Sequence, residues 1–228
     1  MEAIILAGGL GQRLKEVVPD LPKPMAPING RPFLEFIVLQ LRAFSIFNII
    51  ISIGYKGDVI KRYFGDGSKW CVNIKYSEET EPLGTGGAVK HAGDKIKGSD
   101  FIVINGDTYL ELDFHSFINF HRDHKAVATI AIITVEDDAR YGHVLINKES
   151  EIVKFDEKGR TGVGLINGGV YCLRQEVITL IPDGISSIEY NLFPKILGKG
   201  LYGFHTQGKF IDIGTPESFM LAQVMLKE

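Results

Sequence analysis

Short apolar runs rich in β-branched residues alternate with amphipathic segments through the first part of the chain. The apolar runs are typical of strands and cover residues 3–8, 48–54, 72–78, 100–107 and 126–134. The segments between them have helical spacing of their apolar positions and cover residues 32–44, 56–65, 85–96 and 114–124. Parallel strands joined by crossover helices produce this alternation, so the pattern predicts a doubly wound α/β sheet.

The spacing of the elements changes after about residue 141. Stretches with strand character then follow one another with little helix between them, at residues 141–147, 151–159 and 162–173. They predict a small antiparallel extension of the sheet. Residues 187–197 and 215–228 again have helical character. Because no linker, repeat or low-complexity tract separates these parts, we expect one domain over residues 1–228, with lobes of residues 1–140 and 141–228.

Composition limits the class of protein. The 228 residues are 45% hydrophobic and 23% charged, as in an ordinary soluble globular protein. The net charge of −3 disfavours a nucleic-acid partner, and the apolar runs are far shorter than the roughly 20 residues of a membrane span. Glu2 and the glycines soon after it argue against a signal peptide. Cys71 and Cys172 lie outside any CxxC pattern, so we expect free thiols in a reducing cytoplasm.

The first strand leads directly into a loop that contains Gly8, Gly9 and Gly11, followed by Arg13. Glycines at this place are typical of a backbone that approaches a phosphate closely. The dinucleotide fingerprint fails, because its sixth position would be Leu14, and no P-loop ending is present. A plain tight turn is the alternative, but an arginine matches phosphate oxygens two at a time, so we favour phosphate binding.

Two further stretches suggest contacts with the same ligand. Lys23 lies between two prolines, which suggests a cation aimed by a rigid backbone, although a solvated surface lysine is the alternative. Gly84, Gly86 and Gly87 lie at the turn from the third strand into a helix. Close packing of helix on sheet would explain one such glycine, whereas a flat base or sugar against the backbone would explain all three.

Two aspartates lie at predicted strand ends, where α/β sheets bind ligands. Asp107 follows the strand at residues 100–107, and Asp212 follows a short strand before a helix that begins near Thr215 and Pro216. Two such carboxylates are suited to Mg²⁺, which takes one or two of them together with phosphate and water. The alternative for Asp212 is that it caps the helix.

Polar residues in the second lobe suit a sugar. Glu157 and Lys158 are neighbours near the end of a predicted strand, and a charged hairpin is the alternative interpretation. Asn167, Gly168 and Gly169 offer a polar side chain and bare backbone to sugar hydroxyls.

Seven stretches together resemble the motifs of sugar-1-phosphate nucleotidyltransferases of the glycosyltransferase-A-like type. In chain order they are LAGGLGQRL at 6–14, PKPMAPI at 22–28, EPLGTGGA at 81–88, NGD at 105–107, EK at 157–158, INGGVY at 166–171 and DIGTPE at 212–217. They extend over almost the whole chain. The resemblance implies a Rossmann-like mixed sheet with a small antiparallel sugar-binding extension, in which the first lobe mainly binds nucleotide and the second mainly binds sugar phosphate.

The resemblance also implies roles for individual residues. The catalytic cations would be Arg13, Lys23 and Lys158. The nucleotide would contact Leu6, Ala7, Gly8, Gly9, Gly11, Arg13, Lys23, Glu79 and Gly84. The sugar and its phosphate would contact Asp107, Gly142, Glu157, Lys158 and Asn167. Asp107 and Asp212 would hold Mg²⁺.

The expected reaction joins a nucleoside triphosphate to a sugar 1-phosphate in one direct displacement and releases pyrophosphate. Many relatives have a glutamine before the glycine-rich loop at residues 84–87, whereas Glu78, Glu79 and Glu81 lie there in this chain. These acids, the GTGGA form and the short length most resemble guanylyltransferases, which implies GTP as the nucleotide. Glu79 is the expected contact, since a carboxylate can accept both adjacent N–H groups of guanine. A heptose 1-phosphate is the expected acceptor, for surface polysaccharide synthesis; mannose 1-phosphate and uridylyl, thymidylyl or cytidylyl transfer are the alternatives.

Three other functions remain open at this point. The first is a glycosyltransferase that consumes a nucleotide sugar, and the second is a regulatory module that binds one without turnover. The third is a choline-phosphate cytidylyltransferase, although the stretch at residues 166–171 offers only Tyr171 to an aromatic acceptor pocket. A homodimer is compatible with the sequence.

Overall fold

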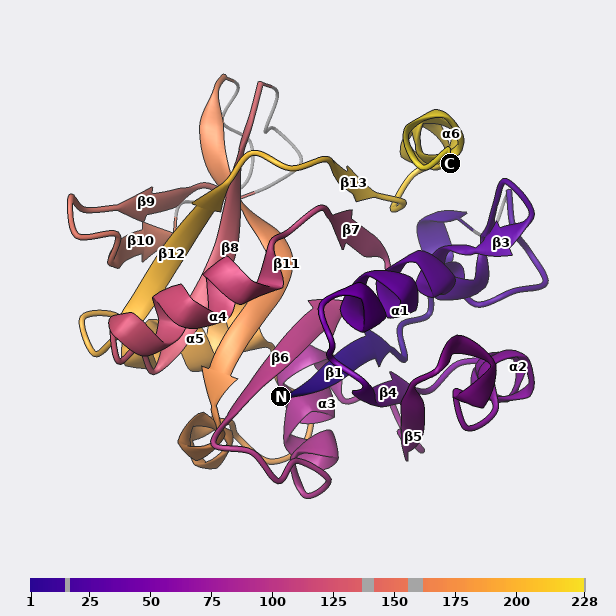
Figure 1. The fold of residues 1–228 in the computed structure, drawn as a ribbon, viewed down its shortest axis with the longest axis horizontal. Coiled ribbons are helices and arrows are strands. Elements are labelled where there is room, and N and C mark those ends of the chain that lie inside the picture. Colours follow the sequence, from indigo (N-terminus) through magenta and orange to yellow (C-terminus); the bar gives the residue numbers. More distant parts are fainter. Residues whose placement is uncertain (15–16, 137–141, 156–161, 228) are drawn as a thin grey trace.

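A seven-stranded mixed sheet forms the centre of the computed structural model, which describes residues 1–14, 17–136, 142–155 and 162–227 (Figure 1). The strand order is β12-β8-β11-β6-β1-β4-β5. The bounds of these strands are β1 Glu2–Ala7, β4 Asn48–Ile53, β5 Asn73–Glu78, β6 Asp100–Asn105, β8 Ala128–Val135, β11 Gly164–Arg174 and β12 Leu201–Thr206. The neighbours β6, β1, β4 and β5 are parallel, which confirms the predicted α/β class.

Strand β11 corrects one prediction. Residues 162–173 were expected in a small antiparallel extension; β11 is antiparallel as expected, but it lies inside the central sheet and pairs with both β6 and β8. Its successive residues Val170, Tyr171, Cys172 and Leu173 are all buried, so both of its faces are covered. Strand β12, parallel to β8, was not predicted.

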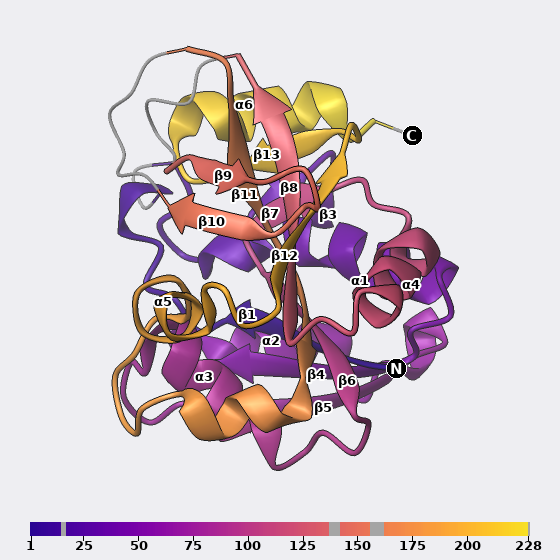
Figure 2. The same ribbon diagram turned by 90° about the vertical axis from the view of Figure 1, so that its left-hand side faces the viewer.

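Helices cover both faces of the sheet (Figure 2). Their bounds are α1 Phe33–Ala43, α2 Gly57–Phe64, α3 Gly84–Gly93, α4 Phe114–Asp123, α5 Phe193–Ile196 and α6 Pro216–Met225. Side chains alternate between the faces of a strand. Ile5 of β1 accordingly packs in a cluster with Leu34 of α1 and Phe117 of α4, whereas Ile4 packs with Val89 of α3 and Phe193 of α5.

Three short strand pairs complete the fold. They are β2 Pro27–Ile28 with β3 Arg31–Pro32, β7 Thr108–Leu110 with β13 Phe210–Asp212, and β9 Val144–Ile146 with β10 Ile152–Phe155. The hairpin of β9 and β10 is the part of the predicted antiparallel extension that lies outside the main sheet. The helix predicted at residues 187–197 is a π-helical turn, Ile188–Leu192, followed by α5. No helix in the described ranges could span a bilayer.

Candidate functional site

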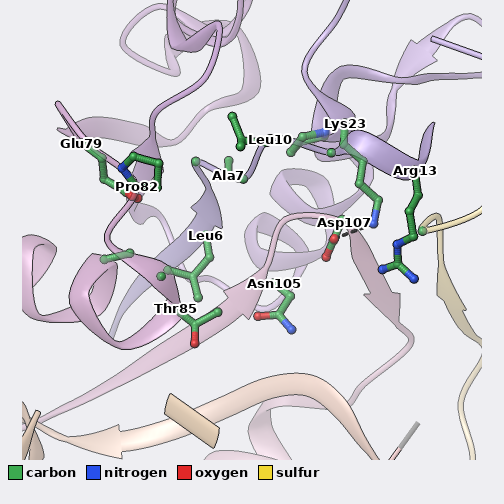
Figure 3. A pocket seen from close by; sticks show the side chains of 17 residues that line it. Leu6, Ala7, Leu10, Arg13, Lys23, Glu79, Pro82, Thr85, Asn105 and Asp107 are labelled. Carbon is green, nitrogen blue, oxygen red and sulfur yellow. Dashed lines mark hydrogen bonds and ion pairs between the residues drawn. The ribbon is translucent and has the colours of Figure 1, made fainter. Parts of the chain in front are cut away.

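A pocket of about 590 Å³ opens where β1 and β6 end and α3 begins (Figure 3). Its position follows from the parallel order, because the carboxyl ends of β1 and β6 meet at one edge of the sheet. All nine residues predicted to contact a nucleotide line it: Leu6, Ala7, Gly8, Gly9, Gly11, Arg13, Lys23, Glu79 and Gly84. Asp107 lines the same pocket. Residues from distant parts of the sequence therefore converge on one cavity.

The glycines of the loop after β1 have different structural reasons. A Cβ on Gly8 would lie 2.6 Å from Oε1 of Glu79, and a Cβ on Gly11 would lie 2.8 Å from Cβ of Lys23. Gly11 also has a φ of 56°, which an L side chain rarely adopts. A Cβ on Gly9 would meet nothing within 4 Å. Of these three glycines, only Gly9 has no neighbouring protein group that would collide with a side chain. Its bare backbone is therefore open to a ligand.

The glycines at the start of α3 pack against residues 184–187. A Cβ on Gly84 would lie 2.5 Å from the carbonyl oxygen of Ser186, and a Cβ on Gly86 would lie 2.8 Å from the Oγ of the same serine. A Cβ on Gly87 would clash with the carbonyl oxygen of Gly184. Close packing therefore accounts for all three glycines, contrary to the expectation that it would explain only one. Gly84 alone of the three also lines the pocket.

Glu79 faces the pocket and is fixed on both sides. The Ser52 hydroxyl donates to its Oε1 at 2.9 Å, and the Leu83 amide donates to its Oε2 at 3.0 Å. Each carboxylate oxygen retains a second lone pair, so the group can still accept hydrogen bonds from a ligand. Glu78 instead forms an ion pair of 2.6 Å with Lys61, and Glu81 is exposed and does not line the pocket. Glu79 is thus the one of the three acids that lines the pocket and can contact a ligand there.

Lys23 bridges the two aspartates predicted to hold a metal. Its Nζ lies 2.6 Å from Oδ2 of Asp107 and 3.4 Å from Oδ1 of Asp212. The side chain of Lys23 is only 10% exposed, so the alternative of a solvated surface lysine is wrong. Lys23 begins a short 3₁₀ helix, Lys23–Met25, and Pro22 and Pro24 flank it. The backbone that carries this cation is consequently stiff.

The pairing of β7 with β13 brings the two aspartates together. Asp212 is the register partner of Thr108, which follows Asp107 directly. The Ile213 amide also donates to the carbonyl oxygen of Asp107 at 3.1 Å. The alternative role for Asp212 as a helix cap is wrong, because Thr215 is the N-cap of α6.

The donor set suits a hard divalent cation that is shared with a substrate. Two carboxylates, Asp107 and Asp212, already converge on one positive charge, the ammonium of Lys23. Within the described ranges no group of three or more His, Cys, Asp or Glu side chains is placed to hold a metal ion. Mg²⁺ commonly takes one or two carboxylates and completes its shell with water and phosphate oxygens. These residues therefore fit magnesium in the presence of a phosphate ligand.

The predicted sugar contacts are placed less completely. The side chain of Asn167 is held internally, because its Oδ1 accepts from the Gly169 amide at 2.9 Å and its Nδ2 donates to the Tyr171 hydroxyl at 3.0 Å. Gly142 precedes the β9–β10 hairpin and is half-buried. Glu157 and Lys158 lie outside the described residues. The sugar-binding roles of these four residues remain predictions.

Glu189 is a functional candidate that the sequence analysis missed. Its Oε1 accepts from the Tyr171 hydroxyl at 3.1 Å and its Oε2 accepts from the Thr85 hydroxyl at 3.0 Å. Thr85 and Asn105 line the pocket, so this network forms part of the pocket's support. Burial raises the pKa of Tyr171 well above 10, and the Glu189 carboxylate raises it further, which keeps the phenol protonated as a donor. The only sequence signal for Glu189 was an acid early in a predicted helix.

Comparisons with known proteins show the family of the whole chain. The family model described as nucleotidyl transferase matches residues 2–228. The chain is 42% identical to the D-glycero-alpha-D-manno-heptose 1-phosphate guanylyltransferase of Aneurinibacillus thermoaerophilus, over 100% of this chain and 99% of that protein. It is 35% identical to a mannose-1-phosphate guanylyltransferase of Mycobacterium tuberculosis, over 96% of this chain and 63% of that protein. The crystal structure of HddC from Yersinia pseudotuberculosis complexed with GMP-PN superposes with a TM-score of 0.89 at 41% identity, and 99% of each chain is covered.

Proposed function

The chain belongs to the nucleotidyl transferase family and is a sugar-1-phosphate nucleotidyltransferase, and from this premise we propose that it transfers GMP from GTP to a heptose 1-phosphate. The proposed products are a GDP-heptose and pyrophosphate. The observation that carries the proposal is the contact of Lys23 with both Asp107 and Asp212, because Lys23 and Asp107 line the same pocket as the glycine-rich loop.

The proposed nucleophile needs no general base from the protein. A phosphate monoester has a second pKa of about 6, so the sugar 1-phosphate is mostly a dianion at pH 7. The barrier is instead the approach of two anions, since two unit charges about 4 Å apart repel by about 4 kcal/mol at an effective dielectric of about 20. Catalysis then consists of holding the reacting phosphates in line and neutralising their charge.

The residues of the pocket can meet this requirement. Lys23 and Arg13 both line it and would neutralise the triphosphate, and the open backbone at Gly9 would let amide groups approach the phosphate oxygens. Asp107 and Asp212 would hold magnesium, which when bound supplies neutralising charge to the phosphate oxygens. Lys158 is proposed to pair with the phosphate of the sugar, as the sequence motif implies.

The choice of guanine rests on Glu79. Guanine presents adjacent N1–H and N2–H donors, and the Glu79 carboxylate is fixed at the pocket wall by Ser52 and Leu83 with lone pairs to spare. The similarity to heptose 1-phosphate guanylyltransferases over the full chain supports both GTP and heptose. Mannose 1-phosphate is the second candidate acceptor, because mannose-1-phosphate guanylyltransferases are also similar to this chain.

A pyrophosphate-release screen tests the proposed function. The enzyme is mixed with Mg²⁺, each common nucleoside triphosphate and a panel of sugar 1-phosphates that includes heptose and mannose 1-phosphates. We expect release only when both substrates are present, with GTP and the heptose 1-phosphate giving the highest kcat/KM. Turnover with another nucleotide would overturn the base assignment. Absence of pyrophosphate in every mixture, with sugar transfer from a nucleotide sugar instead, would replace the function by that of a glycosyltransferase.

A further inference from the structure

The ammonium of Lys23 occupies the place between the carboxylates that the proposed function gives to a divalent cation. It lies 2.6 Å from Oδ2 of Asp107 and 3.4 Å from Oδ1 of Asp212, and a dashed line marks the shorter contact in Figure 3. The two carboxylates are more exposed than the lysine, at 38% and 21% against 10%. The positive charge is therefore the least exposed member of the group, and both carboxylates are more accessible than the lysine that neutralises them.

The fold positions Lys23 for this contact without any ligand. Pro22 and Pro24 restrict the backbone on either side, and Pro24 and Met25 are buried. The loop after β1 packs directly on Lys23. A Cβ at Gly11 would lie only 2.8 Å from the Cβ of Lys23, so a side chain at position 11 would collide with the lysine. The Cα and Cβ of Lys23 are thereby fixed. The outer part of its four-carbon chain still has rotatable bonds, so the ammonium can move while the backbone stays in place.

The ammonium and a divalent cation cannot use the same carboxylate oxygens together. Oδ2 of Asp107 is in direct contact with Nζ of Lys23, and a second cation at that oxygen would meet a like charge at close range. Arg13 differs from Lys23 in this respect. It lines the same pocket, yet within the described ranges it forms no ion pair with Asp107 or Asp212.

We propose that Lys23 is a built-in counter-ion which a divalent cation must displace from Asp107 and Asp212 before it can bind. The inference rests on the proposed function, because that function places the metal on these two aspartates. In the absence of substrates the lysine neutralises the carboxylates, and on metal binding its ammonium moves into the pocket toward the proposed position of the triphosphate. Metal and lysine thus compete for one pair of carboxylates, and the affinity for metal is lower than the aspartates alone would give.

Mn²⁺ binding to the enzyme without any substrate tests this exchange. Electron paramagnetic resonance measures free Mn²⁺ against wild type, Lys23→Met, Arg13→Gln and the double variant Lys23→Met with Asp107→Asn. Met keeps most of the length of Lys and removes its charge. We expect Lys23→Met to bind one Mn²⁺ at least about tenfold more tightly than wild type, since a charge-assisted hydrogen bond no longer has to be broken. The added Asp107→Asn should abolish that gain.

Arg13→Gln is the matched control for net charge. It removes one positive charge from the same pocket without vacating either carboxylate, so its Mn²⁺ affinity should change much less than that of Lys23→Met. An equal gain in Mn²⁺ affinity in both variants would show that only the net positive charge of the pocket matters, and it would overturn the proposed exchange of lysine for metal. No tightening in Lys23→Met, with its melting temperature unchanged, would also overturn it. Because no substrate is present, either result leaves the pyrophosphate-release test of the proposed function to be decided separately.

Discussion

Single residues in the pocket are constrained by their neighbours in the protein as well as by the proposed ligand. Gly8 shows this, because the space that its side chain would occupy is taken by Oε1 of Glu79. A Cβ on Gly9, one residue later, would meet nothing within 4 Å. The two glycines look equivalent in the sequence, and only the fold distinguishes a packing requirement from an opening toward the pocket.

This difference predicts opposite effects of the same substitution. Gly8→Ala should lower the free energy of unfolding by about 1–3 kcal/mol, because Glu79 must move or the loop must shift. Gly9→Ala should be neutral or slightly stabilising, since its backbone is compatible with alanine and the unfolded chain loses freedom. Urea denaturation of both variants measures the effect. Equal destabilisation would contradict the assigned contact between Gly8 and Glu79.

Glu79 supports a prediction about the base. Glu79→Gln should lower kcat/KM for GTP by about tenfold, because an amide cannot accept from both donor groups of guanine while also keeping its contacts with Ser52 and Leu83. Discrimination between GTP and ITP should narrow, since ITP lacks the N2 amino group. Glu81→Gln is the control and should behave like wild type. A loss confined to Glu81→Gln would transfer the role to that residue.

Much of the pocket could be predicted at the scale of the residue. Short motifs identified Arg13, Lys23, Glu79 and the glycines at positions 8, 9, 11 and 84, and all of these residues line one cavity. The reasons for the glycines at the start of α3 could not be predicted, because residues 184–187 that require them lie far away in the sequence. The contribution of Glu189 was missed for the same reason, since its partners Tyr171 and Thr85 come from other elements.

At the scale of elements, the predicted strands and helices match the structure where the two alternate along the chain. The match is poorer in the second half, where strands follow one another antiparallel. Strands β1, β4, β5, β6 and β8 and helices α1 to α4 fall where the apolar pattern placed them. Strand β11 was expected in a small extension rather than within the central sheet, because a run that is apolar on both faces does not state which neighbours it pairs with. Its antiparallel position between β6 and β8 depends on contacts that a local pattern does not contain.

The contact between α4 and β8 contains a buried histidine with consequences for stability. His121 is 1% exposed, and its Nδ1 is 2.8 Å from the hydroxyl of Thr129. Burial lowers the pKa of His121 to about 4; Asp100 opposes this shift, and Arg174 and Arg122 add to it. An unfolded histidine titrates at about 6.5. The unfolded chain therefore binds a proton that the folded chain excludes between these two pKa values.

The sign of the pH effect follows directly. Stability from His121 is complete above about pH 6.5 and falls as the pH drops toward 4, by about 3 kcal/mol in total. His121→Gln should flatten this part of the pH profile of the free energy of unfolding, as measured by urea denaturation. His115→Gln, on the exposed side of the same helix, is the control and should retain the wild-type slope. An unchanged slope in His121→Gln would mean that other groups cause the pH dependence.

At the scale of the whole molecule, the site depends on the pairing of β7 with β13. The sequence separates Asp107 from Asp212 by half the chain, and each aspartate only marked the end of a strand. The short antiparallel pair joins them, and Lys23 reaches both from a third segment near the N-terminus. Both the positions at strand ends and the family motifs predicted that the two aspartates share a site, but neither predicted the strand pair that joins them. The division into a nucleotide-binding lobe of residues 1–140 and a sugar-phosphate-binding lobe of residues 141–228 also concerns the whole molecule, and it remains a prediction.

The central claim is that Asp107 and Asp212 hold a divalent cation for nucleotidyl transfer in this pocket. The most direct test measures the Mg²⁺ dependence of pyrophosphate release in wild type, Asp107→Ala and Asp212→Ala, with Asp58→Ala as a control on the surface of α2. Circular dichroism and the melting temperature establish that each variant is folded. We predict that Asp107→Ala and Asp212→Ala each lower kcat at saturating substrate by at least about a hundredfold, while Asp58→Ala matches wild type. Rates and Mg²⁺ dependence equal to wild type in both site variants would contradict the account.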